Sequence, residues 1–367
     1  MSASSGPRIL VVDDSALMRR ALSSILEQIP GAAVRTARNG QDALTEIERW
    51  QPDVVTLDVN MPVMDGLTCL SQVMTSFPRP VVMVSSITTK DSEATLEALS
   101  MGAIDVIEKP DGTVSRRLDE LGHTIRRTVR GAARAKLPAA RARPPAEPRV
   151  PEPTRRAPSR QSSIGPGRGG DRVVVLGIST GGPNALEAVV PALPGDLPVP
   201  VVVAQHMPAN FTASFASRLD ARSEIAVVEA RRTTPLEPGR VYIVHGGGDA
   251  VLRKRLGRFV LEPLPVDLQY SWHPSVERLA ASALETYDPR HVLGVLMTGM
   301  GDDGARAMTE LRKRGGHTIA ESEVSAVVYG MPRELVERGG ASEVVELAEV
   351  AHRIVSWAQG PRGRTCR

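Results

Sequence analysis

The chain has 367 residues, of which 41% are hydrophobic and 3% aromatic, with a formal net charge of +3 and a sequence isoelectric point near 9.1. This length predicts two or three domains, each with a buried core. No apolar run approaches the roughly 18 residues of a membrane span, and residues 1–7 lack a signal-peptide pattern, so we expect a cytoplasmic protein without membrane insertion.

In residues 7–130, apolar β-branched runs alternate with segments of helical period. One predicted helix covers residues 15–28, where apolar side chains recur every three to four positions. The predicted strands are 9–12, 34–36, 54–57, 81–84 and 104–107. This alternation is typical of a doubly wound parallel sheet, so the first predicted domain is α/β and flavodoxin-like.

Polar residues stand at the carboxyl ends of these predicted strands, which meet along one edge of a parallel sheet. They are Asp13, Asp14, Asp58, Ser85 and Lys109. Three converging carboxylates need a counter-charge, and Mg²⁺ is the natural cation for oxygen ligands. Asp58 could attack phosphorus while Ser85 and Lys109 contact phosphoryl oxygens. Any one of these residues alone is better explained by a capping or surface role; together, in this order, they indicate a phosphoryl acceptor.

From Arg8 to about Arg130 the chain resembles the receiver domain of two-component response regulators. The resemblance rests on Val-Asp-Asp-Ser at 12–15, Asp-Val-Asn-Met-Pro-Val-Met-Asp-Gly at 58–66, Ser85-Ser86 and Lys109-Pro110. It implies that Asp58 is phosphorylated and that Mg²⁺ is held by Asp13, Asp14, Asp58 and the Asn60 carbonyl. It also implies Ser85 as the switch hydroxyl, Lys109 as the phosphate-sensing base, and a CheA-type histidine kinase as phosphodonor.

Residues 131–170 form a basic, proline-rich segment with nine basic and two acidic residues and eight prolines between Pro138 and Pro166. Almost no large apolar side chain is present, so the segment cannot offset the entropy of ordering. We predict a disordered, semi-extended linker between two domains. The basic excess lies here and not in a folded domain, which favours a solvated spacer over an RNA- or membrane-binding segment, and we expect no nucleic-acid partner.

The alternation resumes over residues 171–360 and predicts a second doubly wound, Rossmann-like α/β domain. The predicted strands are 173–178, 199–204, 225–228, 241–244 and 292–298, with a hairpin formed by 251–256 and 258–261 and a last helix over 343–358.

A glycine-flanked serine follows the first strand of this domain. In Gly177-Ile-Ser-Thr-Gly181 the strand ends in a sharp turn that could expose Ser179 as a nucleophile, although the run is also consistent with a structural turn. His206 follows the next strand and Asp302 and Asp303 follow a later one, so a base and an orienting carboxylate are available. The order Ser, His, Asp differs from that of the α/β-hydrolases.

Residues 171 to about 358 resemble the catalytic domain of the chemotaxis protein-glutamate methylesterase family, CheB. Four blocks carry this resemblance: 177–182, 205–220, 298–304 and 328–333. The family pattern Met-Gly-x-Asp-Gly implies Asp303, not Asp302, as the third member of a Ser179–His206–Asp303 triad. Residues 244–249 depart from the family pattern in a loop near the cleft.

This resemblance implies phosphorylation-activated hydrolysis of glutamate γ-methyl esters, and deamidation of glutamines, on methyl-accepting chemotaxis receptors. The backbone N–H groups of Thr180 and Met300 are the expected oxyanion donors, and no cofactor is expected for the esterase. The receiver is expected to cover the active site until it is phosphorylated, and we expect a monomer.

The main alternative is a phosphorylation-controlled binding or scaffold protein in which Ser179 is only a turn residue. A DNA-binding regulator is less well supported, because no helix-turn-helix pattern follows the linker. A dinucleotide enzyme is also less well supported, because Gly177-Ile-Ser-Thr-Gly-Gly does not match G-x-G-x-x-G.

Overall fold

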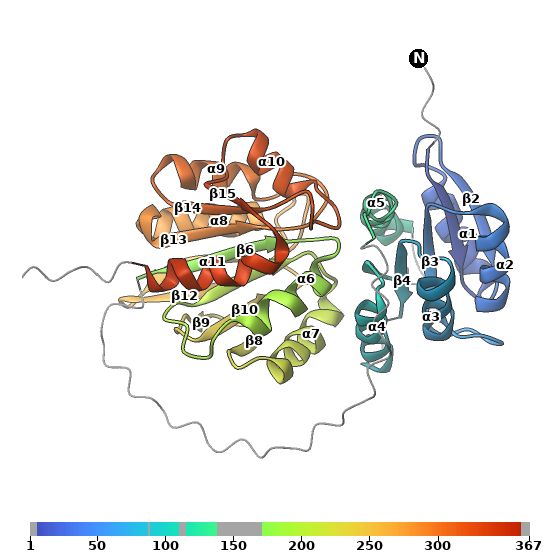
Figure 1. The fold of residues 1–367 in the computed structure, drawn as a ribbon, viewed down its shortest axis with the longest axis horizontal. Helices are drawn as coiled ribbons and strands as arrows, with labels where there is room; N and C mark the ends of the chain where they lie inside the picture. The colour runs from blue at the N-terminus through green and yellow to red at the C-terminus, as the bar shows by residue number, and fades with distance from the viewer. Residues whose placement is uncertain (1–5, 87–88, 110–114, 138–170, 361–367) are drawn as a thin grey trace, which may run out of the picture.

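The computed structural model describes residues 6–86, 89–109, 115–137 and 171–360, and most of the predicted linker lies outside these ranges. Figure 1 shows two α/β bodies, with helices of the first turned toward the second. In the described ranges no helix combines the length and the apolar character that a bilayer crossing requires.

The first body is a five-stranded parallel sheet with the order β2-β1-β3-β4-β5, which is the flavodoxin-like order. Helices α1 and α5 pack on one face of the sheet, and α2, α3 and α4 pack on the other. Its elements are β1 (Arg8–Val12), α1 (Ala16–Leu26), β2 (Ala33–Ala37), α2 (Gly40–Trp50), β3 (Val54–Asp58), α3 (Gly66–Ser76), β4 (Val81–Ser85), α4 (Thr89–Met101), β5 (Asp105–Glu108) and α5 (Ser115–Ala132).

The second body has a seven-stranded parallel sheet with the order β15-β14-β13-β6-β7-β10-β8 and a small antiparallel sheet, β11-β12-β9. Its strands are β6 (Val173–Ile178), β7 (Val201–Gln205), β8 (Ala226–Ala230), β9 (Thr234–Pro235), β10 (Arg240–Val244), β11 (Asp249–Arg255), β12 (Arg258–Leu264), β13 (Val292–Leu296), β14 (His317–Glu321) and β15 (Glu343–Val345). Its α-helices are α6 (Gly182–Val189), α7 (Ala209–Arg222), α8 (Val276–Thr286), α9 (Ala305–Lys313), α10 (Met331–Glu337) and α11 (Leu347–Gln359), with short 3-10 turns at Val190–Ala192 and Pro289–His291.

The predicted α/β architecture is confirmed in both bodies. Each predicted strand lies within two residues of an observed one, and the predicted hairpin forms β11 and β12. Strands β3, β4, β6, β7 and β13 are buried along their whole length, as expected for parallel strands covered by helices on both faces.

The prediction of one helix over 343–358 is wrong at its start. Residues Glu343–Val345 form β15, which pairs in parallel with β14, and the helix begins only at Leu347. The two valines 344 and 345 favour an extended backbone beside an open sheet edge. The sequence analysis also missed β14, whose run His-Thr-Ile-Ala-Glu mixes polar and apolar residues.

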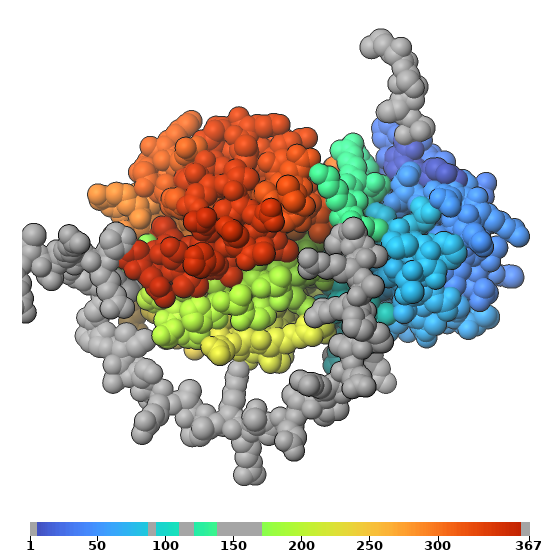
Figure 2. All heavy atoms as spheres, in the orientation of Figure 1, coloured from blue at the N-terminus to red at the C-terminus, as the bar shows by residue number. Residues whose placement is uncertain are grey.

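The two bodies meet through β5, the segment before it, and the helices α4 and α5. Figure 2 shows α5, coloured green, filling the junction between the blue and the orange bodies. Backbone N–H of Gly181 donates to the Ile104 carbonyl at 3.1 Å, and the Asn184 side-chain amide donates to the Ala103 carbonyl at 3.2 Å. The segment of the first body before β5 is therefore bonded directly to the start of α6.

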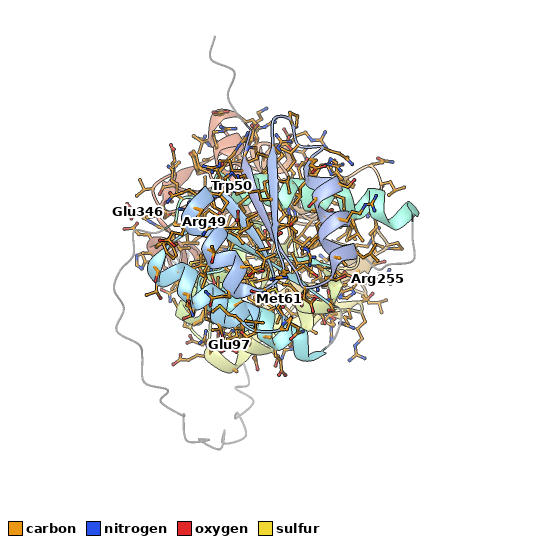
Figure 3. The ribbon with its side chains drawn as sticks, turned by 90° about the vertical axis from the view of Figure 1, so that its right-hand side faces the viewer. Arg49, Trp50, Met61, Glu97, Arg255 and Glu346 are labelled. Atoms are coloured by element: carbon orange, nitrogen blue, oxygen red, sulfur yellow. The ribbon has the colours of Figure 1, made fainter. Side chains whose placement is uncertain are left out.

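The outer face of the first body carries an aromatic–cation cluster. Figure 3, which views this face, labels Trp50 at the end of α2. The guanidinium carbons of Arg8 and Arg35 each lie 4.8 Å from its ring centroid, so the indole joins β1 and β2 to α2. The cluster lies on the labelled outer face, away from the junction with the second body.

Candidate active site and phosphorylation site

Ser179 and His206 leave two neighbouring parallel strands at the same level. The β6–β7 register pairs Gly177 with Ala204 and Ile178 with Gln205, so the next residues stand side by side. Ser179 is 6% exposed and enters a tight turn, because Gly181 adopts φ +80° as the N-cap of α6. Gly177 is required at its position, since a Cβ there would overlap the side chain of Val276.

A chain of hydrogen bonds joins Ser179, His206 and Asp303. Ser179 Oγ lies 2.9 Å from His206 Nδ1, and His206 Nε2 lies 2.9 Å from Asp303 Oδ2. Because ionised Asp303 can only accept, Nε2 carries the proton and Nδ1 is left to accept the serine hydroxyl. In the chymotrypsin-type triad the serine faces Nε2 and the carboxylate faces Nδ1, so the two ring nitrogens exchange partners here.

Asp303 is held by the start of α8. Its carboxylate accepts the backbone N–H groups of Val276 at 2.7 Å and Glu277 at 2.9 Å, and the Ser275 hydroxyl at 3.2 Å. These three donors at the start of α8 fix the position of the carboxylate. The neighbouring Asp302 is instead exposed and pairs with Arg338 at 3.5 Å. The geometry therefore brings Asp303, and not Asp302, to the imidazole.

Burial lowers the pKa of His206, while the hydrogen bond and charge of Asp303 act in the opposite direction and Arg127 and His273 lower the pKa further. The net effect favours the neutral imidazole near pH 7. A neutral ring with a free Nδ1 lone pair can accept the proton of Ser179.

The expected oxyanion donors lie beside Ser179. Within the described residues, the backbone N–H groups of Thr180 and Met300 donate to no protein group. Both residues line the same cavity as Ser179 and His206. These N–H groups are therefore available to a negatively charged oxygen that develops there.

Three polar residues that the sequence analysis missed hold this turn in place. Gln205 Nε2 donates to the carbonyls of Ser179 and His206, both at 3.0 Å. Thr298 Oγ1 donates to the Thr180 carbonyl at 2.9 Å, and Thr298 N–H donates to Glu321 at 2.8 Å. All three are buried polar residues at the end of a strand or within two residues after it, which is the signal that could have identified them.

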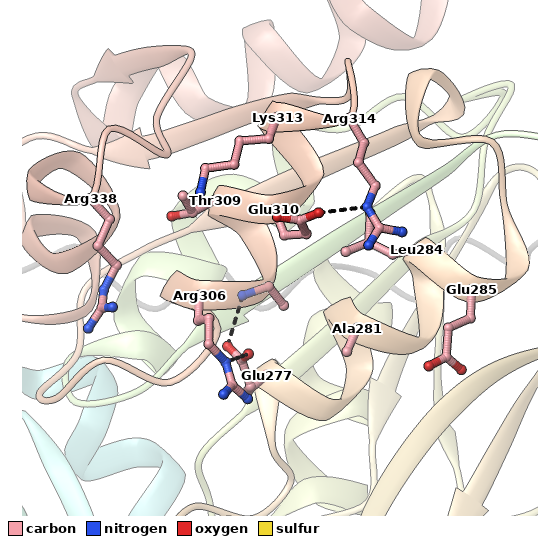
Figure 4. Close-up of a pocket in the computed structure, with 11 residues that line it drawn as sticks. Glu277, Ala281, Leu284, Glu285, Arg306, Thr309, Glu310, Lys313, Arg314 and Arg338 are labelled. Carbon is pink, nitrogen blue, oxygen red and sulfur yellow. Dashed lines mark hydrogen bonds and ion pairs between the residues drawn. The ribbon is translucent and has the colours of Figure 1, made fainter.

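The candidate active site opens into a cavity of about 430 Å³ between the two bodies. Residues of β5 and α5 in the first body, among them Asp105 and Arg127, form one wall, and the other wall holds Ser179, His206 and Met300. A larger groove of about 650 Å³ lies between α8 and α9, where Glu277 accepts bonds from Arg306 and from Ala307 N–H (Figure 4). Among the described residues that line this groove, none is a predicted site residue. Glu277 nevertheless joins the start of α8 to α9 and so supports the position of Asp303.

The predicted phosphoryl-acceptor residues of the first body also converge. Lys109 Nζ lies 3.0 Å from Asp13 and 2.8 Å from Asp58, and ligand oxygens of Asp13, Asp14 and Asp58 lie within 4.8 Å of one another. Burial raises the pKa of Asp58 to about 6, against the lowering effect of Lys109. Asn60 follows at the same edge, with its N–H 3.5 Å from Asp58. Oxygen donors in this number suit a hard divalent cation.

Ser85 ends β4 as predicted and is fully buried. Its Oγ accepts a hydrogen bond from Thr95 of α4 at 2.9 Å. The hydroxyl therefore links the carboxyl end of β4 to one of the helices that face the second body.

The loop at 244–249 is fixed by two histidines. His245 Nδ1 lies 2.8 Å from Glu229, and His273 Nδ1 lies 3.0 Å from the buried Asp249. Gly246 and Gly247 line the interdomain cavity between these anchors. The loop that departs from the family pattern thus forms part of the cavity wall. The contacts that join Ser179, His206 and Asp303 are present beside it.

Comparisons with known proteins cover nearly all of the chain. Residues 174–354 match the family model described as CheB methylesterase, and residues 9–116 match that of the response regulator receiver domain. A protein-glutamate methylesterase/protein-glutamine glutaminase of Rhodospirillum rubrum is 48% identical over 361 residues, covering 95% of this chain and 96% of the relative. A second, of Rhodopseudomonas palustris, is 47% identical and covers 95% and 98%.

Among solved structures, the Thermotoga maritima CheB methylesterase catalytic domain is 36% identical with a TM-score of 0.49, covering 50% of this chain and 97% of that domain. The response regulator domain of Thermotoga maritima CheB is 36% identical with a TM-score of 0.33, covering 36% of this chain and 98% of that domain.

Proposed function

We propose, since this chain belongs to the CheB methylesterase family and carries a response regulator receiver domain, that it hydrolyses glutamate γ-methyl esters on methyl-accepting chemotaxis receptors. The single observation that carries the proposal is the continuous Ser179–His206–Asp303 hydrogen-bond chain at the carboxyl edge of the second sheet. The same machinery would deamidate receptor glutamines, because an amide and an ester share an acyl carbon open to attack.

Acylation begins when His206 Nδ1 takes the proton of Ser179 and the serine oxygen bonds to the ester carbonyl carbon. The carbonyl electrons move to oxygen, where the N–H groups of Thr180 and Met300 stabilise the charge, each donor contributing about 3 kcal/mol. The carbonyl then reforms, the bond to the methoxy group breaks, and His206 protonates the departing methanol. Asp303 keeps the ring oriented and stabilises the imidazolium.

Deacylation repeats these steps with water. His206 takes a proton from water, whose oxygen adds to the acyl carbon, and the proton then passes to the departing Ser179 oxygen. The products are the receptor carboxylate and free enzyme. With a glutamine substrate, ammonia leaves in place of methanol.

Phosphorylation of Asp58 is the proposed control. Asp13, Asp14, Asp58 and the Asn60 carbonyl would hold Mg²⁺, which neutralises charge on the incoming phosphoryl group. Lys109 and Ser85 would contact the phosphoryl oxygens, and a CheA-type histidine kinase would supply the group. Because the cavity wall opposite Ser179 belongs to the receiver, undocking of the receiver would open the site to a receptor.

The test compares methanol release from methylated receptor membranes by the native chain and by Ser179→Ala. We expect the variant to release methanol no faster than buffer. Equal release by both proteins would instead favour the scaffold alternative for this chain.

The control step has a separate test. Under a small phosphodonor such as phosphoramidate, Asp58→Asn is expected to keep basal hydrolysis and lose stimulation, and chelation of Mg²⁺ should do the same to the native chain. Stimulation that persists in either case would contradict the assignment of Asp58.

A further inference from the structure

We propose that the face of the Trp272 indole is the surface on which the reacting ester or amide group of the substrate lies, and that Arg127 of the receiver occupies this place while the domains are docked. The inference rests on the proposed hydrolysis at Ser179. It adds the pocket that receives the side chain and the receiver residue that fills it.

Trp272 is fixed next to the candidate base. Its ring is nearly parallel to that of His206, with an angle of 13° and a centroid separation of 6.3 Å. Gly301 has φ +92°, and a Cβ there would lie 2.5 Å from Trp272 Cζ2, so the ring is seated against the backbone of the Asp303 loop. Its Nε1 is buried without a partner in the described residues. This indole therefore presents a rigid apolar face beside the imidazole.

Arg127 lies on that face. Its guanidinium carbon is 5.2 Å from the Trp272 ring centroid, and one N–H donates to the Ser271 carbonyl at 3.1 Å. Arg127 also lines the cavity that contains Ser179 and His206. Burial lowers the pKa of Arg127 to about 10, although the charges of Asp105 and Asp303 act in the opposite direction. The arginine is held as a ligand would be, by an aromatic face and one carbonyl.

The chemistry of the guanidinium indicates what replaces it. A guanidinium is a planar sp² group that stacks on aromatic rings. Ester and primary amide groups are also planar and sp², so either can lie flat on the indole. A glutamine amide can in addition donate an N–H to the Ser271 carbonyl, as Arg127 does. The pocket therefore fits both an esterified and an amidated side chain.

The geometry of α5 supports a helical substrate. Arg127 projects from a helix, and one turn further along a Cβ at Gly131 would lie 3.4 Å from Met300 Sδ and 3.5 Å from Thr180 Oγ1. A helix backbone thus approaches the catalytic turn to van der Waals distance. We infer that a receptor helix takes the position of α5 and presents its reacting side chain where Arg127 lies.

The test uses the full chain with saturating phosphodonor, so that the docked state does not contribute. Trp272→Leu keeps an apolar side chain but removes the ring, and we expect kcat/KM for methylated receptors to fall about tenfold, mainly through KM. Trp272→Phe should restore most of this loss. Trp357→Phe is the matched control. Trp357 lies in α11, and its ring stacks against the guanidinium group of Arg172. An unchanged KM for Trp272→Leu, or a loss confined to kcat with a shifted pH profile, would overturn the proposal.

A second variant tests the occupant. Without phosphodonor, Arg127→Ala should raise basal methanol release several-fold and leave the fully stimulated rate unchanged. Arg130→Ala, on the exposed side of the same helix, should change neither rate. Basal release that stays low in Arg127→Ala would contradict the inference. Failure of the proposed function itself would be seen separately, as methanol release by Ser179→Ala.

Discussion

At the scale of single residues, the carboxylate at 303 is distinguished from its neighbour by its donors. Asp303 faces two backbone N–H groups, a hydroxyl and the imidazole, whereas Asp302 faces solvent and Arg338. We predict that Asp303→Asn lowers kcat on the order of 10³- to 10⁴-fold, because the amide cannot hold the productive tautomer of His206. Asp302→Asn is the matched control and should retain nearly full activity. Steady-state methanol release measures both, and similar losses in the two variants would contradict the assignment.

The pKa of His206 sets the acid limit of activity. Burial lowers this pKa below the usual 6.5, so the ring stays neutral, and able to accept a proton, to a lower pH than an exposed histidine. Activity should fall only as pH drops through the lowered value. Because Arg127 also lowers the pKa, undocking of the receiver should move the limit upward. The pH profile of kcat/KM with and without phosphodonor measures both effects. An acid limit of activity above pH 6.5 in the unstimulated enzyme would contradict the lowered pKa of His206.

Much of the candidate site could be predicted from residue types and the order of strands. Ser179 and His206 follow neighbouring strands of the second sheet, Asp58 ends a strand of the first sheet, and the choice of Asp303 came from the resemblance. The hydrogen-bond partners of the supporting residues Gln205, Thr298 and Glu321 could not be predicted, since these bonds join segments separated by up to 118 residues. The order in which His206 uses its ring nitrogens depends on side-chain torsions that no local pattern encodes.

At the scale of elements, the packing of β6 against the start of α8 aligns the triad. A Cβ at Gly177 would overlap Val276, whose N–H binds Asp303. We predict that Gly177→Ala moves the start of α8, costs about 1–3 kcal/mol of stability and lowers kcat at least tenfold. The double variant Gly177→Ala with Val276→Ala removes the overlapping methyl groups and should recover part of the activity. Denaturant titration and methanol release test this, and a double variant no better than the single would rule out the steric explanation.

Strands buried on both faces were the easiest elements to predict, because they are unbroken apolar runs such as Val173–Ile178. The edge of the second sheet was the hardest. β14 contains polar residues that bond to Ser342 and Glu343, and β15 has only three residues, so neither shows a clear period. Pairing between them supplies the stability that the local sequence does not.

At the scale of the whole molecule, the sequence predicted two domains and a tether, and the resemblance implied that the receiver covers the active site, but neither predicted which groups of the two domains come into contact. The docked arrangement depends on backbone groups, such as the Ile104 carbonyl, that have no sequence signature. It also buries Asp105, whose pKa burial raises to about 6 although Thr180 and Arg127 act to lower it. Desolvation of a charged carboxylate at the junction opposes docking, and phosphorylation needs to supply only about 1.4 kcal/mol to shift the equilibrium between docked and undocked states tenfold.

The bond between Asn184 and the Ala103 carbonyl is a direct means of testing this balance. Asn184→Ala removes one partly buried interdomain hydrogen bond, worth about 1 kcal/mol, and should shift docking about fivefold toward the open state. Basal methanol release should rise by up to that factor, while the rate under saturating phosphodonor should not change, because the open state already dominates there. Lys136→Ala removes the exposed interdomain ion pair with Glu323 and is expected to raise basal release less than twofold. If Asn184→Ala instead lowered the stimulated rate, the side chain would act on substrate and not on docking, and the junction would have to be held by the other contacts, those of α4 and α5 and the bond from Gly181 N–H to the Ile104 carbonyl.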